Sequence, residues 1–172
     1  GGLTMKASEA ILKRRSVRKF LDKPVEDNLL RLLLESAMAA PSAVNMQPWE
    51  FYIVRNTDIL GKLRASTPYT NMNSPLIIIV AGNSDRFLPE GKADFWVQDC
   101  SAATQNILIT AVELGLGTCW CGIYPKRDAI KSIRNILALE DHIIPLSLIH
   151  IGHPSGEHEA RTQFNENYVH HI

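Results

Sequence analysis

A run of five consecutive apolar residues, Leu-Ile-Ile-Ile-Val at 76–80, places the strongest constraint on the fold of this chain. Pro75 and Gly82 bound the run, which is long enough for a strand and too short for an ordinary helix. Because no polar side chain alternates with the apolar ones, both faces of this strand are expected to be buried. The sheet that contains it therefore needs cover on both sides.

Helical and strand patterns are interleaved along the rest of the chain. Residues 94–114 combine a broad apolar face with many small side chains, which predicts a long helix that another helix can approach closely. Phe51 and Ile53 alternate with Tyr52 and Val54 in a predicted strand. Further helices are expected within 8–14, 25–40, 61–66 and 126–139, and further strands within 115–124 and 144–152. This succession predicts an α+β or three-layer α/β fold with about four strands.

Length and charge narrow the class of protein. The 172 residues fit a single domain over 1–172, in which residues 1–5 are expected to be leader residues outside the fold. A formal net charge of zero argues against broad electrostatic binding to nucleic acid or to an anionic membrane. The apolar runs are far shorter than the roughly 20 residues that span a bilayer, and three cysteines make no disulfide framework. A cytoplasmic protein is therefore expected.

Two polar stretches are candidate binding segments. Residues 14–19, Arg-Arg-Ser-Val-Arg-Lys, crowd four basic side chains around one serine. Guanidinium groups present fixed pairs of donors to phosphate, so this cluster is a candidate anion site, although most such clusters are solvated surface. Residues 41–48, Pro-Ser-Ala-Val-Asn-Met-Gln-Pro, offer a hydroxyl and two amides between a predicted helix and a predicted strand. This second stretch is either a binding loop or a connection with incidental polar residues.

Cysteine and histidine residues give weaker indications. Cys119 and Cys121 are one residue apart on a predicted strand and should point to the same face. Because no second cysteine pair supplies further metal ligands, they are interpreted as core or cleft-lining residues. His150 and His153 fall at a strand end, where surface histidines are common. The chain has none of the signatures of serine hydrolases, zinc proteases, P-loop proteins or dinucleotide-binding domains.

Four segments, in this order, resemble the FMN-dependent nitroreductase family: RRSVRKF at 14–20, AAPSAVNMQPWEFYIV at 39–54, QDCSAATQNILITAVELGLGTCWCGIY at 98–124 and LIHIGHP at 148–154. The resemblance extends from about Lys6 to His170. It implies a three-layer α/β/α fold, a central mostly antiparallel sheet, and an intertwined homodimer with FMN at the subunit interface. In such a dimer the helix at 94–114 and the polar tail after Gly152 would both contact the partner subunit.

The resemblance also implies a set of FMN contacts at the basic cluster. Arg14 and Ser16 match contacts to the phosphate or the ribityl chain, and Arg18 matches the basic residue beside the pyrimidine ring. Arg15 lies within the same motif, and its contact is less well defined. A permanent positive charge at Arg18 would favour the reduced flavin, which is more negative near N1 and O2.

Further contacts implied by the resemblance come from three other segments. The loop that is expected to reach the FMN of the other subunit contains Pro41, Ser42, Asn45 and Gln47. Cys121 and Gly122 match positions whose backbone lies at the reactive edge of the flavin, where glycine permits close approach. Arg161 matches a phosphate contact in the tail. Many members have a second basic residue two positions later, where this chain has Gln163, so the share of the tail in phosphate binding is open.

The activity implied by the resemblance needs no catalytic side chain, because tightly bound FMN carries the redox chemistry. The expected reaction is a ping-pong hydride transfer from transiently bound NADH or NADPH to a nitroaromatic, a quinone or a related small acceptor. Residues 83–96 are the only sizeable expected cover of the cleft, although Phe87, Phe95 and Trp96 could instead belong to a dimer core. Alternatives are a flavin-binding sensor, a specialised FMN enzyme that catalyses dehalogenation or flavin fragmentation, and a domain that binds no flavin.

Overall fold

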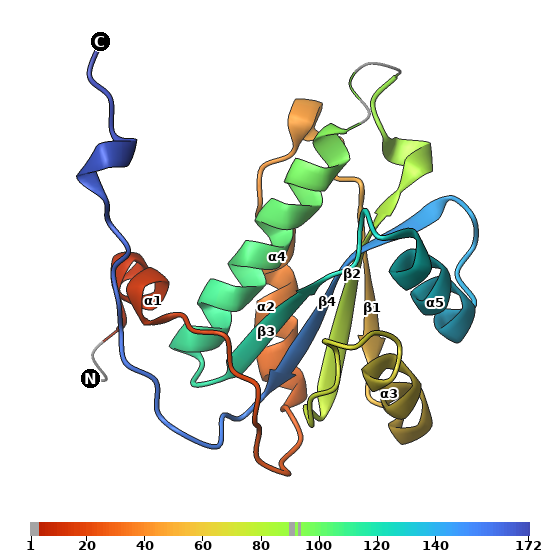
Figure 1. Ribbon diagram of the computed structural model, residues 1–172, viewed down its shortest axis with the longest axis horizontal. Helices are drawn as coiled ribbons and strands as arrows, with labels where there is room; N and C mark the ends of the chain where they lie inside the picture. The colour runs from red at the N-terminus through yellow and green to blue at the C-terminus, as the bar shows by residue number, and fades with distance from the viewer. Residues whose placement is uncertain (1–3, 90–91, 93) are drawn as a thin grey trace.

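A four-stranded sheet forms the centre of the molecule (Figure 1). The computed structural model describes residues 4–89, 92 and 94–172. The strands are β1 Trp49–Val54, β2 Leu76–Asn83, β3 Gly117–Gly122 and β4 Ile143–Gly152. They lie in the order β1-β2-β4-β3, and each neighbouring pair is antiparallel. The expected α+β class and antiparallel sheet are confirmed, and β3 is an edge strand.

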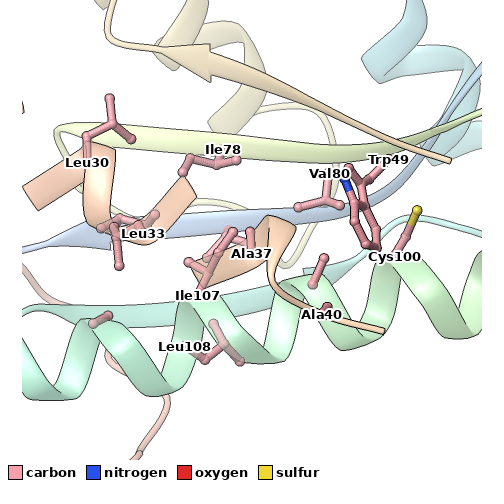
Figure 2. Packing of buried hydrophobic residues seen from close by; sticks show 14 of the residues in the cluster. Leu30, Leu33, Ala37, Ala40, Trp49, Ile78, Val80, Cys100, Ile107 and Leu108 are labelled. Atoms are coloured by element: carbon pink, nitrogen blue, oxygen red, sulfur yellow. The ribbon is translucent and has the colours of Figure 1, made fainter. Parts of the chain in front are cut away.

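Helices cover both faces of the sheet, as the apolar run in β2 predicts. Ile78 and Val80 face the layer that contains α2 and α4, and Figure 2 shows their side chains packed against those helices. Ile77 and Ile79 face the opposite layer, which contains α3 and α5. The helices are α1 Ala7–Lys13, α2 Asp27–Met38, α3 Thr57–Arg64, α4 Phe95–Glu113 and α5 Arg127–Leu137. Burial of each large aliphatic side chain contributes about 1.5–3 kcal/mol, so these two interfaces supply most of the folding free energy.

Helix α4 lies across one face of the sheet through the residues predicted for its apolar face. Trp96, Cys100, Ala103, Ile107 and Ala111 are all buried. Their spacing of three or four residues forms one continuous stripe, which the small side chains keep close to the sheet. None of the described helices is long and apolar enough to cross a bilayer.

The segment expected to cover the cleft contains a cluster of aromatic side chains. Phe87 stacks on Trp96 with ring centroids 4.9 Å apart, and Trp96 meets the edge of Tyr124 at 4.9 Å. Trp96 therefore belongs to the core of its own chain, whereas Phe95 is exposed. Within this expected cover, residues 90, 91 and 93 lie outside the described part, as do residues 1–3 of the expected leader.

The C-terminal tail differs from the rest of the chain in being exposed along its length. Residues 155–172 follow β4, pass beside α1 and end well away from the sheet (Figure 1). The only regular element in the described tail is the short turn η3, Glu166–Tyr168. Phe164 is 73% exposed and Tyr168 is 81% exposed. Phe164 and Tyr168 therefore have little packing against the described residues of this chain.

Candidate functional site

The basic segment that follows α1 lies along the open edge of β3. The Val17 N–H donates to the Thr118 carbonyl at 2.8 Å, and Ser16 pairs with Thr118 in an isolated parallel bridge. Alternate side chains of an extended segment point to opposite sides. Val17 is buried under α4 and β3, so Ser16 and Arg18 lie on the other side.

The thiol of Cys119 reports the charge of this segment. A hydrogen bond with Cys121 lowers the pKa of Cys119, and the guanidinium groups of Arg18 and Arg14 lower it further. The Ser16 hydroxyl makes a smaller contribution that lowers the pKa of Cys119 in the same direction. Among the described residues, no ion pair includes Arg14 or Arg18. The structure thus brings three predicted residues together beside β3 with two positive charges that no carboxylate neutralises.

Arg15 and Arg161 link this segment to the tail. The Arg15 Nη1 atom donates to the Glu159 carbonyl at 3.1 Å, on the side of the segment away from Ser16 and Arg18. The Arg161 N–H donates to the Leu12 carbonyl at 3.1 Å, two residues before Arg14. The structure therefore brings the Arg161 backbone close to the basic segment, while Arg15 holds the tail in place.

Gly122 presents an open backbone edge at the other end of β3. The Ile123 N–H donates to the Leu146 carbonyl at 3.0 Å, and the groups of an antiparallel ladder point alternately toward and away from the neighbouring strand. The N–H and carbonyl groups of Gly122 consequently face away from β4, as those of Thr118 do. A Cβ atom added at Gly122 would meet none of the described atoms within 4 Å. Packing within the subunit therefore gives no reason for a glycine at this position.

Two residues that no sequence motif marked lie at this edge. The Tyr69 hydroxyl donates to the Gly122 carbonyl at 2.8 Å, and the Lys126 Nζ atom lies 4.1 Å from the centre of the Tyr69 ring. The Cys121 Sγ atom is 3.6 Å from the Tyr69 carbonyl oxygen. Cys121 is buried, in agreement with its interpretation as a core or cleft-lining residue, and its place at the flavin edge stays a prediction. The 66–70 loop borders this edge through Tyr69, which only the tertiary structure reveals.

The polar loop after α2 has a fixed and strained shape. Val44, Asn45 and Gln47 all have positive φ angles, between 48° and 54°, which side-chain-bearing residues seldom adopt. The Ser42 hydroxyl oxygen accepts from the Gln47 N–H at 3.0 Å, and the Gln47 Nε2 atom donates to the Asn45 Oδ1 atom at 2.9 Å. Pro41 is exposed at the start of the loop. The structure thus brings these four predicted residues together in one compact turn.

The two groups of predicted residues lie near opposite ends of α4. The loop meets this helix at Asp99, where the Ala43 N–H donates to the carboxylate at 2.9 Å. The basic segment meets the other end, where Val17 packs over Gly117. Fourteen residues separate Asp99 from Glu113, the last residue of α4, and at 1.5 Å per residue they span about 21 Å of helix. One subunit therefore does not bring the loop and the basic segment into a single pocket.

His150 is buried, so the expectation that it lies at the surface is wrong. Its Nδ1 atom lies 2.7 Å from the Ser74 hydroxyl, and its Nε2 atom lies 2.9 Å from the Thr70 carbonyl. Burial lowers the pKa of His150 from 6.5 to about 4. The neutral ring donates from Nε2 to Thr70 and accepts from Ser74. His150 lies opposite Cys119 in the sheet, and its hydrogen bond to the Thr70 carbonyl connects the loop that carries Tyr69 to the strands behind the site.

This histidine predicts a specific pH dependence of stability. Between about pH 6.5 and pH 4 the unfolded imidazole binds a proton that the folded one does not, so stability falls as the pH falls. We expect the free energy of unfolding to drop by about 2 kcal/mol more in the wild type than in His150→Gln between pH 7.5 and pH 5. Urea unfolding at both pH values measures the difference, and equal pH dependence in the two proteins would contradict the assignment.

Comparison with known proteins identifies the family. The model of the nitroreductase family matches residues 11–70 and 68–153. This chain belongs to the nitroreductase family. It is 42% identical over 168 residues to a protein of Methanothermobacter thermautotrophicus that is provisionally named NADH dehydrogenase/NAD(P)H nitroreductase, a match that covers 96% of this chain and 86% of the relative.

Other family members differ in how closely they match. A Bacillus subtilis protein named FMN reductase (NADPH) is 27% identical over 95% of this chain and 72% of its own length. An FMN-dependent nitroreductase from Clostridium difficile superposes with a TM-score of 0.82 at 30% identity, over 94% of this chain and 96% of that one. A provisionally named nitroreductase from Desulfovibrio desulfuricans, solved in complex with FMN, gives 0.83 at 28% identity over 99% and 98% of the two chains.

The residues of this chain fit FMN on two structural observations. No described atom lies within 4 Å of a Cβ position at Gly122, so a flat group could approach the backbone there, where the Gly122 N–H points outward. Arg14 and Arg18, on either side of Ser16, supply positive charge along the same edge. A strand rises about 3.3 Å per residue, so the edge between Thr118 and Gly122 is about 13 Å long. That length suits a ligand with an anionic end and an aromatic end.

Proposed function

We propose that this protein is an NAD(P)H-dependent oxidoreductase that uses tightly bound FMN to reduce a small oxidised acceptor such as a nitroaromatic or a quinone. The observation that carries the proposal is the open backbone edge at Gly122 of β3 together with Arg14 and Arg18 on the segment that runs beside β3, where no described carboxylate pairs with them. Membership of the nitroreductase family supports it. The named activities of the relatives, NAD(P)H nitroreductase and FMN reductase (NADPH), point to the same chemistry.

Most of the predicted residues receive a binding role in this proposal. Arg14 and Ser16 hold the phosphate and the ribityl chain, with Arg161 beside them, while Arg18 lies against the pyrimidine ring. The N–H of Gly122 donates to the reactive edge of the ring, and Cys121 behind it keeps the strand packed. Bound FMN supplies the hydride acceptance and donation that no side chain of the protein can perform. The residues of the chain bind and orient the cofactor and give its site positive charge, so the proposed reaction needs no catalytic acid or nucleophile from the protein.

The proposed active form is a homodimer, because one subunit holds the two groups of residues near opposite ends of α4. In a dimer, Pro41, Ser42, Asn45 and Gln47 of one subunit would complete the site formed by Arg14–Arg18 and Gly122 of its partner. The exposed Phe164 and Tyr168 supply apolar surface for such an interface. Large apolar side chains that are exposed over a continuous segment are typical of protein contact surfaces.

The proposed kinetic order is ping-pong. NAD(P)H donates its hydride and leaves before the acceptor enters, so both use the open face above Gly122 in turn. Two alternatives share the same binding site: a flavin sensor with slow or no turnover, and a specialised enzyme that catalyses dehalogenation or flavin fragmentation. A cytoplasmic location stays a prediction from the sequence.

A reconstitution experiment tests the proposed function. The purified protein is incubated with excess FMN and desalted, and its visible spectrum is recorded before and after anaerobic addition of NADPH or NADH. We expect retained flavin whose absorbance is bleached by at least one of the two nucleotides. Flavin that is retained and stays oxidised would favour the sensor or a specialised enzyme, and loss of all flavin on desalting would overturn the proposal.

A further inference from the structure

We propose that Asp99 and Arg86 are positioning residues that hold the 41–47 loop in the shape in which it contacts the flavin. The inference rests on the proposed function, because it assigns a purpose to side chains that support the loop Pro41–Gln47. Asp99 lies in the segment 98–124 that resembles the family and Arg86 lies outside such segments, but neither is among the residues to which the resemblance gives an FMN contact. They come from two different elements. Asp99 is on α4, and Arg86 ends the short turn η2, Ser84–Arg86.

Asp99 fixes the entry of the loop. Its side chain is only 6% exposed, and its Oδ1 atom accepts the Ala43 N–H at 2.9 Å. A buried carboxylate is costly unless its hydrogen bonds repay the loss of water. The other buried residues of α4 are mostly apolar or small, so a buried carboxylate among them calls for a reason. The Ala43 N–H is the partner that the structure provides for it.

Arg86 fixes the exit of the loop. Its Nε atom donates to the Gln47 carbonyl at 3.1 Å, and its Nη2 atom donates to the Trp49 carbonyl at 2.8 Å. The third arm, Nη1, donates to the Glu50 Oε1 atom at 3.0 Å. Asn83 adds two bonds at the same place, from its N–H to the Pro48 carbonyl at 2.7 Å and from its Nδ2 atom to Glu50 Oε1 at 3.1 Å. The guanidinium group thus binds Gln47, Trp49 and Glu50, the residues through which the chain passes from the loop into β1.

The loop between these two anchors needs external support. Three of its residues with side chains, Val44, Asn45 and Gln47, hold positive φ angles, and such conformations persist only where the surrounding structure determines them. Val44 is 80% exposed, so packing of its side chain does not hold the turn. Fixing both ends before the ligand arrives removes the entropy that a free loop would lose on binding, which raises affinity. Asp99 and Arg86 therefore set FMN affinity without contact with FMN.

The test compares Asp99→Leu with Asp99→Asn and with Glu113→Gln, an exposed site near the far end of the same helix. Leucine keeps the number and branching of the side-chain heavy atoms and removes the acceptor, although its methyl groups are larger than oxygen atoms. Asparagine is close in size to aspartate and keeps an acceptor oxygen for Ala43. Two quantities are measured: amide hydrogen exchange of the 41–47 loop in the FMN-free protein, and the FMN dissociation constant from flavin fluorescence. Asp99→Leu is expected to exchange faster and to raise the dissociation constant about tenfold, while the other two stay within about threefold of the wild type.

The outcomes separate this inference from the proposed function. A wild type that binds FMN together with an Asp99→Leu variant of equal affinity overturns the positioning role alone. A wild type that binds no FMN overturns the proposed function, and the exchange data then still decide whether Asp99 holds the loop. If Asp99→Leu does not fold, Arg86→Met tests the other anchor by the same two measurements. Arg86→Lys keeps the positive charge and some hydrogen-bond donors, so it should bind FMN more tightly than Arg86→Met does. Equal FMN affinity of these two variants would also count against the assignment.

Discussion

Replacement of Gly122 by valine is expected to leave the fold intact and to reduce kcat/KM for NAD(P)H oxidation by about 100-fold. The added side chain meets nothing within 4 Å in its own chain, and the φ angle of Gly122 lies outside the left-handed region. Valine also favours strands, so thermal unfolding should occur at the wild-type temperature or slightly above it. The loss arises because two added methyl groups would hold the flavin ring and the nicotinamide away from the edge to which the Gly122 N–H points.

A second glycine gives the matched control for this prediction. A Cβ atom at Gly61 in α3 also meets nothing within 4 Å, and α3 lies on the opposite side of the sheet from α4. Gly61→Ala should raise stability by about 0.5–1 kcal/mol and leave turnover unchanged, since alanine is the better helix former. Steady-state kinetics and thermal unfolding of both variants decide the matter. Wild-type turnover in Gly122→Val would show that the reacting groups do not approach this edge.

The sequence was sufficient for those parts of the fold that depend on local apolar patterns. The uninterrupted run at 76–80 predicts a strand covered on both faces, and β2 is that strand. The stripe of small and apolar residues in 94–114 predicts α4 to within a residue at each end. In both cases the side chains that determine the element are neighbours in the chain, so their spacing alone carries the information.

Features that join distant segments could not be predicted in this way. His150 sits in an apolar strand pattern beside a glycine, and nothing local indicates that Ser74 and Thr70 will satisfy both of its nitrogen atoms. The approach of Tyr69 to Gly122 likewise joins residues 53 positions apart. Sequence reasoning found the candidate binding residues through a family motif, which marks residues that touch the cofactor. Residues that support others, such as Asp99 and Arg86, carry no such mark.

Removal of the tail after Ser155 is expected to give a folded monomer that has lost FMN binding. Residues 156–172 are exposed throughout, and their described links to the body include the Arg161 N–H bond to Leu12 and the Arg15 bond to Glu159. Loss of the tail should therefore cost the subunit little of its own stability. The exposed Phe164 and Tyr168 would be removed from the interface, and without a partner no 41–47 loop completes the site. We expect the FMN dissociation constant to rise at least about 100-fold, because the Arg161 contact and the polar contacts of the partner's loop are lost together.

Arg161→Met separates assembly from a direct contact with the phosphate. This variant keeps the apolar side chains of the tail and removes one charge, so it should stay dimeric and bind FMN about tenfold more weakly. Light scattering coupled to size-exclusion chromatography gives the mass, circular dichroism gives the fold, and fluorescence titration gives the affinity.

A truncated chain that remains dimeric with wild-type affinity would place both the interface and the missing half of the site elsewhere. A truncated monomer with wild-type affinity would mean that one subunit binds FMN alone, and that the separation of the two residue groups along α4 has no functional consequence.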